Sequence, residues 1–299
     1  MKTTLDELQT FVTVVDCGSI SGAAKRNDMT VSATSRTLAR LEEKLGTTLL
    51  RRTTRRLALT EEGRAYLTRA RKIIGDVVEA EEMLAQRRGV PSGLLRVDAA
   101  TPFMLHVVAP LAMAFQRQYP HIELELNNND QIIDLLEKRT DVAIRIGRLD
   151  DSTLRAAPIG SSQIRVVASP EYIKNYGEPK TIEELKQHKL LGFSSLEKLN
   201  DWPLIDEDGE LLHIRSSLRA SSGETLRRML LQGGGIACLS DFMTQADRKA
   251  GRLITLFDEC TQELRQPINA VYYRNSGVSM RVTRFIEFLQ EHVKQYGFE

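Results

Sequence analysis

The sequence predicts an α/β chain in three parts: an N-terminal helix-turn-helix head, one long helix, and a C-terminal domain of two α/β lobes. Three observations predict this organisation. Short helical segments separated by a three-residue turn occupy residues 1 to about 58. Apolar residues then recur at spacings of 4, 3, 4, 3 and 4 along one helical stretch. From Leu94 onwards, short apolar strands alternate with helices, which is typical of a parallel sheet with helical crossovers.

Composition limits the class of protein. The chain has 299 residues, 41% of them hydrophobic, which suffices for two or three globular units. No stretch approaches the ~18 uncharged apolar residues of a membrane span, and MKTTLDELQTF has no apolar run of signal-peptide length. We therefore expect a cytoplasmic protein with no membrane partner. Cys17, Cys238 and Cys260 are widely spaced and are expected to be reduced thiols rather than a disulfide framework or a zinc site.

Charge is distributed unevenly. Residues 18–60 carry nine basic and three acidic residues, a local balance of +6, so the remainder of this +1 chain carries −5. A basic head on a mildly acidic body indicates a phosphate-bearing partner for the head.

Three short helices are predicted in residues 1–59. The first carries apolar residues at helical spacing and stops at Gly18; the second is SISGAAKRN; the third runs from Val31 to Leu45 and is closed by Gly46. The tight turn DMT separates the second helix from the third. This order is that of a helix-turn-helix.

The third predicted helix begins with TVSATSRT, in which five of eight side chains carry hydroxyl groups although Ser and Thr are indifferent helix formers. Thr30 is the expected N-cap, where a hydroxyl stabilises a helix by about 1 kcal/mol. The inner stripe consists of Val31, Thr34, Leu38, Leu41 and Leu45. The outer side carries Ser32, Ser35, Arg36 and Arg40, in the turns that enter the major groove in a helix-turn-helix. Alone, this pattern also fits a solvated helix face.

The run LLRRTTRRLALT follows directly. It is interpreted as a basic turn between two short strands, a wing whose arginines, Arg51, Arg52, Arg55 and Arg56, lie along a phosphate backbone. A localisation signal or heparin-type basic run is the alternative, and the adjoining helix-turn-helix disfavours it.

Residues 60–88 are predicted to form one long helix that mediates dimerisation. Its narrow seam consists of Tyr66, Ala70, Ile73, Val77, Ala80 and Leu84, flanked by charged residues. The alternative is an amphipathic helix that lies on its own domain. A hinge rich in Gly, Pro and Ser follows at residues 89–93.

The C-terminal domain is predicted to have two lobes. Lobe I comprises residues 94–160 and 268–299, because the strand INAVYYR and the last helix return to it, and lobe II comprises residues 161–267. A ligand crevice is expected between them.

The chain resembles the LysR-type transcriptional regulators from end to end. Matching positions in the first half are Leu8, Phe11, Gly18-Ser19, Ala23-Ala24, Ser32-Ala33, Ser35-Arg36, Leu41-Glu42, Leu45-Gly46, Leu49, Arg52, Arg55, Leu59-Thr60 and Gly63. In the second half, LLRVDAATP, FQRQYPHIELEL, DVAIRIG, ASPEYI, SSGETLRRMLLQGGGIACLS and AVYYRN resemble its CrgA-like subgroup.

The resemblance implies a winged helix-turn-helix, a dimerising linker helix and an effector domain shaped like a type 2 periplasmic binding protein. It implies three partners: promoter DNA, RNA polymerase and a small-molecule effector. An anion is one class of effector. The resemblance also implies a homodimer or homotetramer. No cofactor and no catalytic residues are expected. Where the family commonly has Ser-Gln and an inward Val, this chain has Thr30-Val31 and Thr34. With valine at this position, the Val31 side chain either contacts a thymine methyl group or packs against the protein.

Candidate effector contacts follow strands or precede helices. They are Thr101, Asn128, Asn129, Arg145, Ser221, Ser222, Gly223 and Trp202. Helix N-terminal N–H groups favour anions, but Ser221 and Glu224 also fit a capping box. Arg145 either binds an anion or forms an ion pair with Asp141 or Asp150. Trp202 either lines the crevice or packs in a core.

The sequence disfavours two other classes of function. An enzyme is disfavoured because the five histidines are dispersed and Gly233–Gly235 lacks the pattern of a phosphate or dinucleotide loop. A free solute-binding protein fits the C-terminal half alone, but not the basic head attached to it.

Overall fold

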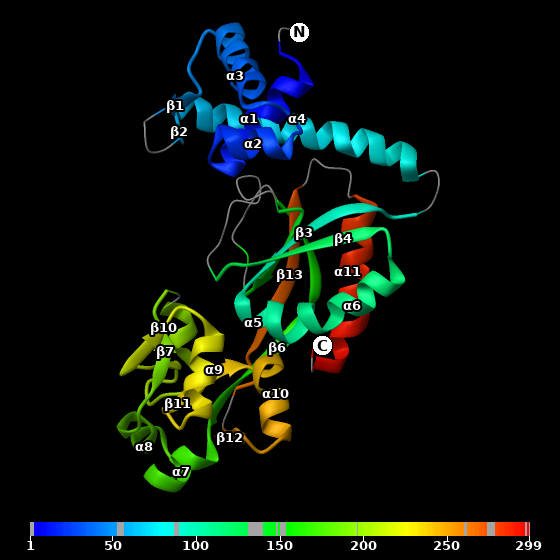
Figure 1. Cartoon of the computed structure of the whole chain (residues 1–299). Helices are drawn as coiled ribbons and strands as arrows, with labels where there is room; N and C mark the ends of the chain where they lie inside the picture. The colour runs from blue at the N-terminus through cyan, green and yellow to red at the C-terminus, as the bar shows by residue number, and fades with distance from the viewer. Residues whose placement is uncertain are drawn as a thin grey trace. The chain divides into compact units, whose positions relative to one another are not determined.

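In a computed structural model, residues 3–52, 57–86, 90–130, 140–147, 149, 154–195, 197–259, 262–273, 279–296 and 298 are described. They form two compact units, one up to residue 86 and one from residue 90 onwards. Figure 1 shows the elements of both units.

The head consists of helices and one short hairpin. Its elements are α1 (Leu5–Cys17), α2 (Ile20–Arg26), α3 (Val31–Leu45), β1 (Leu50–Arg52), β2 (Leu57–Leu59) and α4 (Glu61–Gln86). Each of the three short helices begins at a hydroxyl N-cap, and α1 and α3 end at left-handed glycines, Gly18 and Gly46. Their apolar faces meet in one core that includes Phe11, Leu38 and Leu41. The predicted helix-turn-helix is confirmed, and the third helix has the predicted bounds.

The hairpin β1–β2 is antiparallel, with Leu50 opposite Leu59. The predicted wing tip, including Arg55 and Arg56, lies outside the described residues.

Lobe I of the second unit is a sheet flanked by helices. It contains β3 (Gly93–Ala99), β4 (Ile122–Asn128), β5 (Val142–Ile146), the first part of β6 (Leu154–Ala168), β13 (Arg265–Tyr273), the helical run α5 (Thr101–Phe103), η1 (Met104–Val108) and α6 (Ala109–Gln118), and the C-terminal helices α11 (Met280–His292) and η3 (Val293–Tyr296). α6 and α11 pack against each other, with the rings of Phe115 and Phe285 5.3 Å apart (Figure 1).

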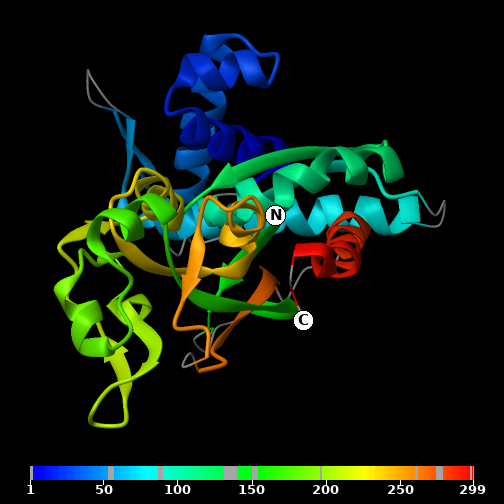
Figure 2. The same cartoon turned by 90° about the horizontal axis from the view of Figure 1, so that it is seen from below.

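Lobe II is built on the far end of β6. It contains α7 (Pro170–Tyr176), α8 (Ile182–Gln187), β7 (Leu191–Phe193), η2 (Glu197–Asn200), β8 (Asp201–Ile205), β9 (Leu211–His213), β10 (Leu218–Ala220), α9 (Gly223–Leu231), β11 (Ile236–Ser240), α10 (Asp241–Lys249) and β12 (Ile254–Leu256). The pairs β7–β10 and β8–β9 form small separate sheets. Figures 1 and 2 both place them far from α6 and α11.

The main sheet is mixed, which corrects the predicted parallel sheet. Its order is β11-β6-β13-β5-β3-β4, with β12 also paired to β6. β3 is parallel to β4 and β5, whereas β13 runs antiparallel to β5 and β6 because the chain returns from lobe II in the opposite direction. Two strands, β6 and β13, therefore connect the lobes.

Candidate functional site

The start of α3 is fixed by its own hydroxyl groups. The Thr30 Oγ1 accepts a hydrogen bond from the Ala33 N–H at 3.1 Å, as an N-cap does. Thr34 is fully buried, and its Oγ1 donates to the Thr30 carbonyl oxygen at 3.1 Å. A threonine is therefore tolerated in the inner stripe because its hydroxyl group has a backbone partner inside the helix.

The outer side of α3 is open to solvent. Ser32, Arg36 and Arg40 are exposed, and Val31 is 53% exposed. Ser35 is half-buried. Among the described residues, Arg36 and Arg40 take part in no ion pair. Apart from half-buried Ser35, the predicted contact residues of α3 are therefore accessible to solvent.

Ion pairs and backbone contacts hold α3 in the head. Lys44 Nζ lies 2.7 Å from the Glu7 Oε1 on α1, and this contact holds the pKa of Glu7 below its usual value. The Glu42 Oε1 accepts hydrogen bonds from the N–H groups of Leu49 and Leu50, at 2.7 and 3.0 Å. The exposed face of α3 is thus fixed relative to α1 and to the hairpin.

The hairpin adds one described arginine to this surface. Arg51 on β1 is exposed. The side chain of Arg52, and all of Arg55 and Arg56, lie outside the described part of the chain.

The seam of α4 divides into two halves, which corrects the sequence interpretation. Tyr66 packs against Phe11 with ring centroids 5.8 Å apart, and Ala70 is fully buried in the head core. These two residues therefore face their own domain. Further along, Ile73 is 44% exposed, Val77 is half-buried and Ala80 is exposed; the side chain of Leu84 is not described.

In the C-terminal unit, carboxylates occupy the ends of the strands. The Asp130 carboxylate accepts hydrogen bonds from the Thr101 N–H at 2.8 Å and from the Thr101 Oγ1 at 3.2 Å. Fully buried Asp98 accepts from the Asn129 side-chain amide and, at 3.1 Å, from the Arg145 Nη1. Arg145 therefore pairs with Asp98, a partner that the sequence did not suggest, and Asp150, one of the suggested carboxylates, lies outside the described residues. Asn128, at the end of β4, is exposed.

Of the two interpretations of the start of α9, ligand contact and a capping box, the capping box is wrong. The N-cap is Ser222 rather than Ser221, and the Ser222 side chain makes no capping hydrogen bond. The Glu224 carboxylate instead contacts His106, Arg227 and Arg228. Gly223 is buried at this helix start, where an added Cβ would lie 3.1 Å from the Met243 Cε and 3.5 Å from the Pro102 Cγ.

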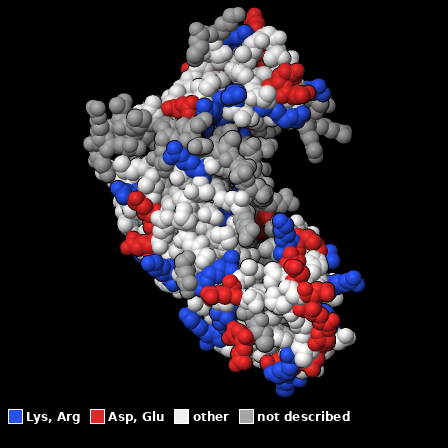
Figure 3. Space-filling view, turned by 180° about the vertical axis from the view of Figure 1, so that it is seen from behind, with Lys and Arg blue, Asp and Glu red and all other residues white. Residues whose placement is uncertain are grey.

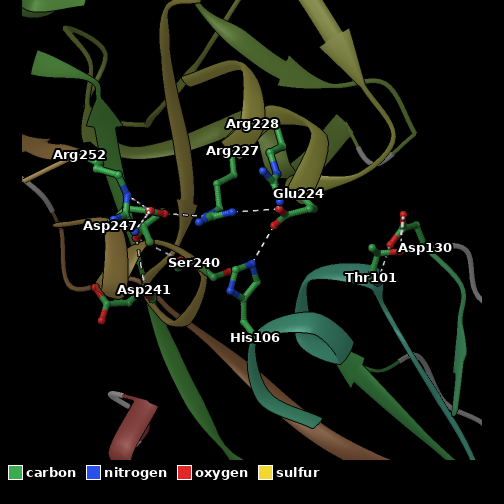
Figure 4. Close-up of polar contacts among 11 residues, drawn as sticks. Thr101, His106, Asp130, Glu224, Arg227, Arg228, Ser240, Asp241, Asp247 and Arg252 are labelled. Carbon is green, nitrogen blue, oxygen red and sulfur yellow. Dashed lines mark hydrogen bonds and ion pairs between the residues drawn. The ribbon is translucent and has the colours of Figure 1, made fainter. Parts of the chain in front are cut away.

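A chain of hydrogen bonds and ion pairs links the lobes (Figure 4). The His106 Nε2 of η1 in lobe I lies 2.7 Å from the Glu224 Oε2 of α9 in lobe II. The other Glu224 oxygen lies 2.9 Å from Arg227, whose Nε reaches fully buried Asp247 at 2.7 Å. Burial alone would raise the pKa of Glu224, but the hydrogen bond with His106 and the charge of Arg227 outweigh it and lower that pKa.

Trp202 does not lie at a ligand site. Its side chain is 1% exposed and packs in the lobe II core with Tyr172, Leu185 and Leu204. The core alternative is therefore correct for this residue, and β8, which carries it, was not predicted.

Sequence reasoning missed the partners of these residues. Asp98, Asp130, His106 and Asp247 lie far along the chain from the groups that they contact. The available signal was Asp98, a carboxylate within the apolar strand LLRVDAA, since a buried acid requires a partner.

The described residues give little support for a metal site, a reactive cysteine or a membrane-spanning helix. They contain no group of three His, Cys, Asp or Glu side chains placed to hold a metal ion. Cys238 is buried, which raises the pKa of its thiol and makes it unreactive. No helix in the described ranges is both long and apolar enough to span a membrane.

Charge differs between the two units. On the face shown in Figure 3, acidic and basic side chains are interspersed over the lower, C-terminal unit. The basic excess of the chain belongs to residues 18–60. A helix-turn-helix head with an open basic face, joined to a two-lobed α/β domain, defines a DNA-binding protein of the ligand-responsive class.

Comparisons with known proteins identify the family. Residues 5–64 match the bacterial regulatory helix-turn-helix protein family of lysR type, and residues 88–294 match the LysR substrate binding domain. The regulator CrgA of Neisseria meningitidis serogroup C (strain 8013) is 48% identical over 294 residues, covering 98% of each chain. The chain belongs to the LysR family and is a LysR-type transcriptional regulator.

Solved structures agree with this assignment. The structure of CrgA from Neisseria meningitidis has 46% sequence identity and a TM-score of 0.66, covering 98% of this chain and 99% of that one. The full-length virulence activator AphB of Vibrio cholerae has 28% identity and a TM-score of 0.59, covering 97% and 99%. The predicted fold class is confirmed by a match that covers 98% of the chain.

Proposed function

We propose that this regulator binds promoter DNA through the exposed start of α3 and the adjacent arginines. Contact residues are Thr30, Val31, Ser32, Ser35, Arg36, Arg40, Arg52, Arg55 and Arg56. The observation that carries the proposal is the open face of α3, where Arg36 and Arg40 are exposed without an ion pair among the described residues. In a helix-turn-helix these turns reach base edges and phosphates.

Two arginine variants test the assigned face. Arg36→Ala should cost about 1–3 kcal/mol and relax the preference for one base pair, because Arg pairs with guanine through two hydrogen bonds. Arg51→Ala should weaken binding by a similar factor for every sequence, since a phosphate contact carries no base information. Affinities for duplexes chosen from a random-sequence library by the full-length protein would be measured by fluorescence anisotropy. Unchanged affinity and preference in Arg36→Ala would contradict the assignment.

We further propose that a small molecule with an acceptor group, such as a carboxylate, binds between the lobes near Thr101, Asn128, Asn129, Arg145 and Ser221–Gly223. Two donors support this: among the described residues the Arg145 Nη2 and the Ser222 Oγ are buried without a hydrogen-bond partner. The chain of polar contacts from His106 to Asp247 would couple the ligand to lobe movement, because a ligand acts only through its different affinities for two states.

The effector proposal has a direct test. A panel of small carboxylic acids would be screened for a rise in the melting temperature of the full-length protein. Ser222→Ala should fold normally, because its Oγ has no partner, and should lose most of that rise. An acid that stabilises both proteins equally binds elsewhere, and no stabilisation by any acid would overturn the proposed class.

Assembly and domain limits complete the proposal. We propose that the head spans residues 1–59, the linker helix 60–88 and the hinge 89–93. Lobe I would comprise residues 94–160 and 268–299, and lobe II residues 161–267. The linker helix would pair two subunits through Ile73, Val77, Ala80 and Leu84, and two dimers would form a tetramer. Such a protein would act in the cytoplasm, where it would meet RNA polymerase at promoters, and would have no catalytic activity.

A further inference from the structure

Val31, the first residue of the predicted inner stripe of α3, is exposed rather than buried. It is 53% exposed and joins none of the hydrophobic clusters formed by the described residues, whereas Thr34, Leu38 and Leu41 of the same stripe are buried. The first residue of α3 therefore points its isopropyl group to solvent. Packing within the head does not explain a valine at this position.

The surroundings of Val31 hold it in one orientation. It follows the N-cap Thr30, whose hydroxyl group contacts the Ala33 N–H and the Ser32 Oγ, both at 3.1 Å. The Thr34 hydroxyl group binds the Thr30 carbonyl oxygen and closes the same turn. Because valine is branched at Cβ, it has one strongly preferred rotamer in a helix. Val31 is thus a rigid apolar projection with exposed polar neighbours.

The charge around this projection indicates what covers it. Arg36 and Arg40 are exposed along the same helix, and residues 18–60 carry a balance of +6. DNA fits this charge, and the N-terminal residues of a recognition helix contact base edges in the major groove. The apolar group that a base edge offers there is the 5-methyl group of thymine.

We propose that Val31 is a specificity-determining residue that contacts a thymine 5-methyl group in each half-site of the operator. The inference rests on the proposed DNA-binding function of α3. It assigns to one side chain a base preference that a hydroxyl or guanidinium group would not provide.

Removing the methyl group from either partner tests the contact. The duplex selected by the full-length protein from a random-sequence library would be synthesised with each thymine replaced in turn by deoxyuridine, which lacks only that methyl group. Burial of one methyl group is worth about fourfold in affinity. At one thymine per half-site, we expect deoxyuridine to weaken wild-type binding about fourfold, and about 15-fold when both half-sites are changed.

The variant Val31→Ala shortens the side chain on the protein side of the proposed contact. Alanine is a better helix former than valine, so the head should fold normally. This variant should bind the thymine and deoxyuridine duplexes alike. Ser32→Ala is the matched control: it alters the neighbouring side chain and should keep the thymine preference.

The outcomes separate the two proposals. Wild-type protein that binds the duplex tightly but tolerates deoxyuridine at every position would overturn the Val31 contact and leave the proposed function intact. Thymine preference that persists in Val31→Ala would also overturn it. If no duplex is selected over random DNA, the proposed DNA-binding function itself fails.

Discussion

Gly63 lies where the first turn of α4 passes closest to the hairpin of the head. A Cβ atom there would lie 2.1 Å from the Leu49 carbonyl oxygen. Beside it, the Thr60 Oγ1 accepts from the Gly63 N–H at 2.9 Å and donates to the Thr48 carbonyl oxygen at 2.8 Å. Space, rather than backbone conformation, therefore requires glycine at this position.

Gly63→Ala should lower the free energy of unfolding of the head by about 2–4 kcal/mol, because the backbone must move to admit a methyl group. Gly75→Ala is the control in the same helix: no atom lies within 4 Å of an added Cβ. It should stabilise α4 by up to about 1 kcal/mol. Urea denaturation of the full-length protein measures both. Equal stability of the two variants would contradict the close approach.

Single residues were predictable where their partners are local. The role of Thr30 as N-cap followed from the sequence, because its partner is three residues away. The inward Thr34 was located, but its carbonyl partner was not anticipated. For Arg145 the sequence left an anion, Asp141 or Asp150 open as partner and did not point to Asp98, which lies 47 positions away along the chain.

Among the elements, helix starts show how far local signals reach. α3 begins and ends as predicted, because Thr30 and Gly46 supply both caps within the helix itself. At α9 the Ser221–Glu224 pattern fitted a capping box equally well, but His106 of the other lobe takes the glutamate. A contact between lobes thus overrides a local motif.

The helical run of lobe I has a feature that periodicity did not reveal. Met104–Val108 is a π-helix, in which the Ala109 N–H donates to the Met104 carbonyl oxygen. Pro110 follows directly and has no N–H to continue the α-helical pattern. The wider turn carries His106, and π-helical turns are often found at functional sites.

The exposed half of the α4 seam carries the proposed subunit contact. Ile73→Glu should weaken self-association at least tenfold, because a charge would enter an apolar seam. Thr68→Glu is the matched control on another face of α4, where Thr68 is exposed. Sedimentation equilibrium of the full-length variants distinguishes them. If Ile73→Glu associates as tightly as Thr68→Glu, the subunits pair elsewhere.

On the scale of the whole C-terminal unit, the lobes share both an apolar and a polar contact. Phe103 of lobe I lies 5.6 Å from Phe242 of lobe II and 6.0 Å from Phe298, measured between ring centroids. His106, which contacts Glu224 of lobe II, lies on the same helical run as Phe103. These contacts hold the lobes in the arrangement described.

Glu224→Gln should destabilise the C-terminal unit by about 1–3 kcal/mol at neutral pH, because it removes a charged acceptor shared by three donors. The folded pKa of Glu224 is lowered. Its contribution is therefore complete above the ordinary carboxyl pKa and is lost as pH falls through the folded value. The difference from wild type should then shrink in acid.

Thermal unfolding across that pH range measures this effect. Arg228→Gln, at a side chain 75% exposed, is the control and should change stability little. A constant deficit for Glu224→Gln at all pH values would show that the charge of Glu224 is not its source.

The three-part organisation of the molecule was predictable, because caps, seam spacing and strand–helix alternation are local signals. The mixed sheet was not, since the antiparallel return of β13 along β5 and β6 depends on where the chain comes back. The inward position of Tyr66 and Ala70 likewise depends on the packing of α1 against α4.

The salt dependence of DNA binding tests the central claim most directly. The affinity of the full-length protein for its selected duplex would be titrated from low to physiological salt. If each subunit of a dimer places several of its exposed arginines on phosphates, log affinity should fall linearly with log salt with a slope of about −4 to −8. A slope of log affinity against log salt near zero would contradict the claim that the basic head binds the phosphates of the DNA backbone.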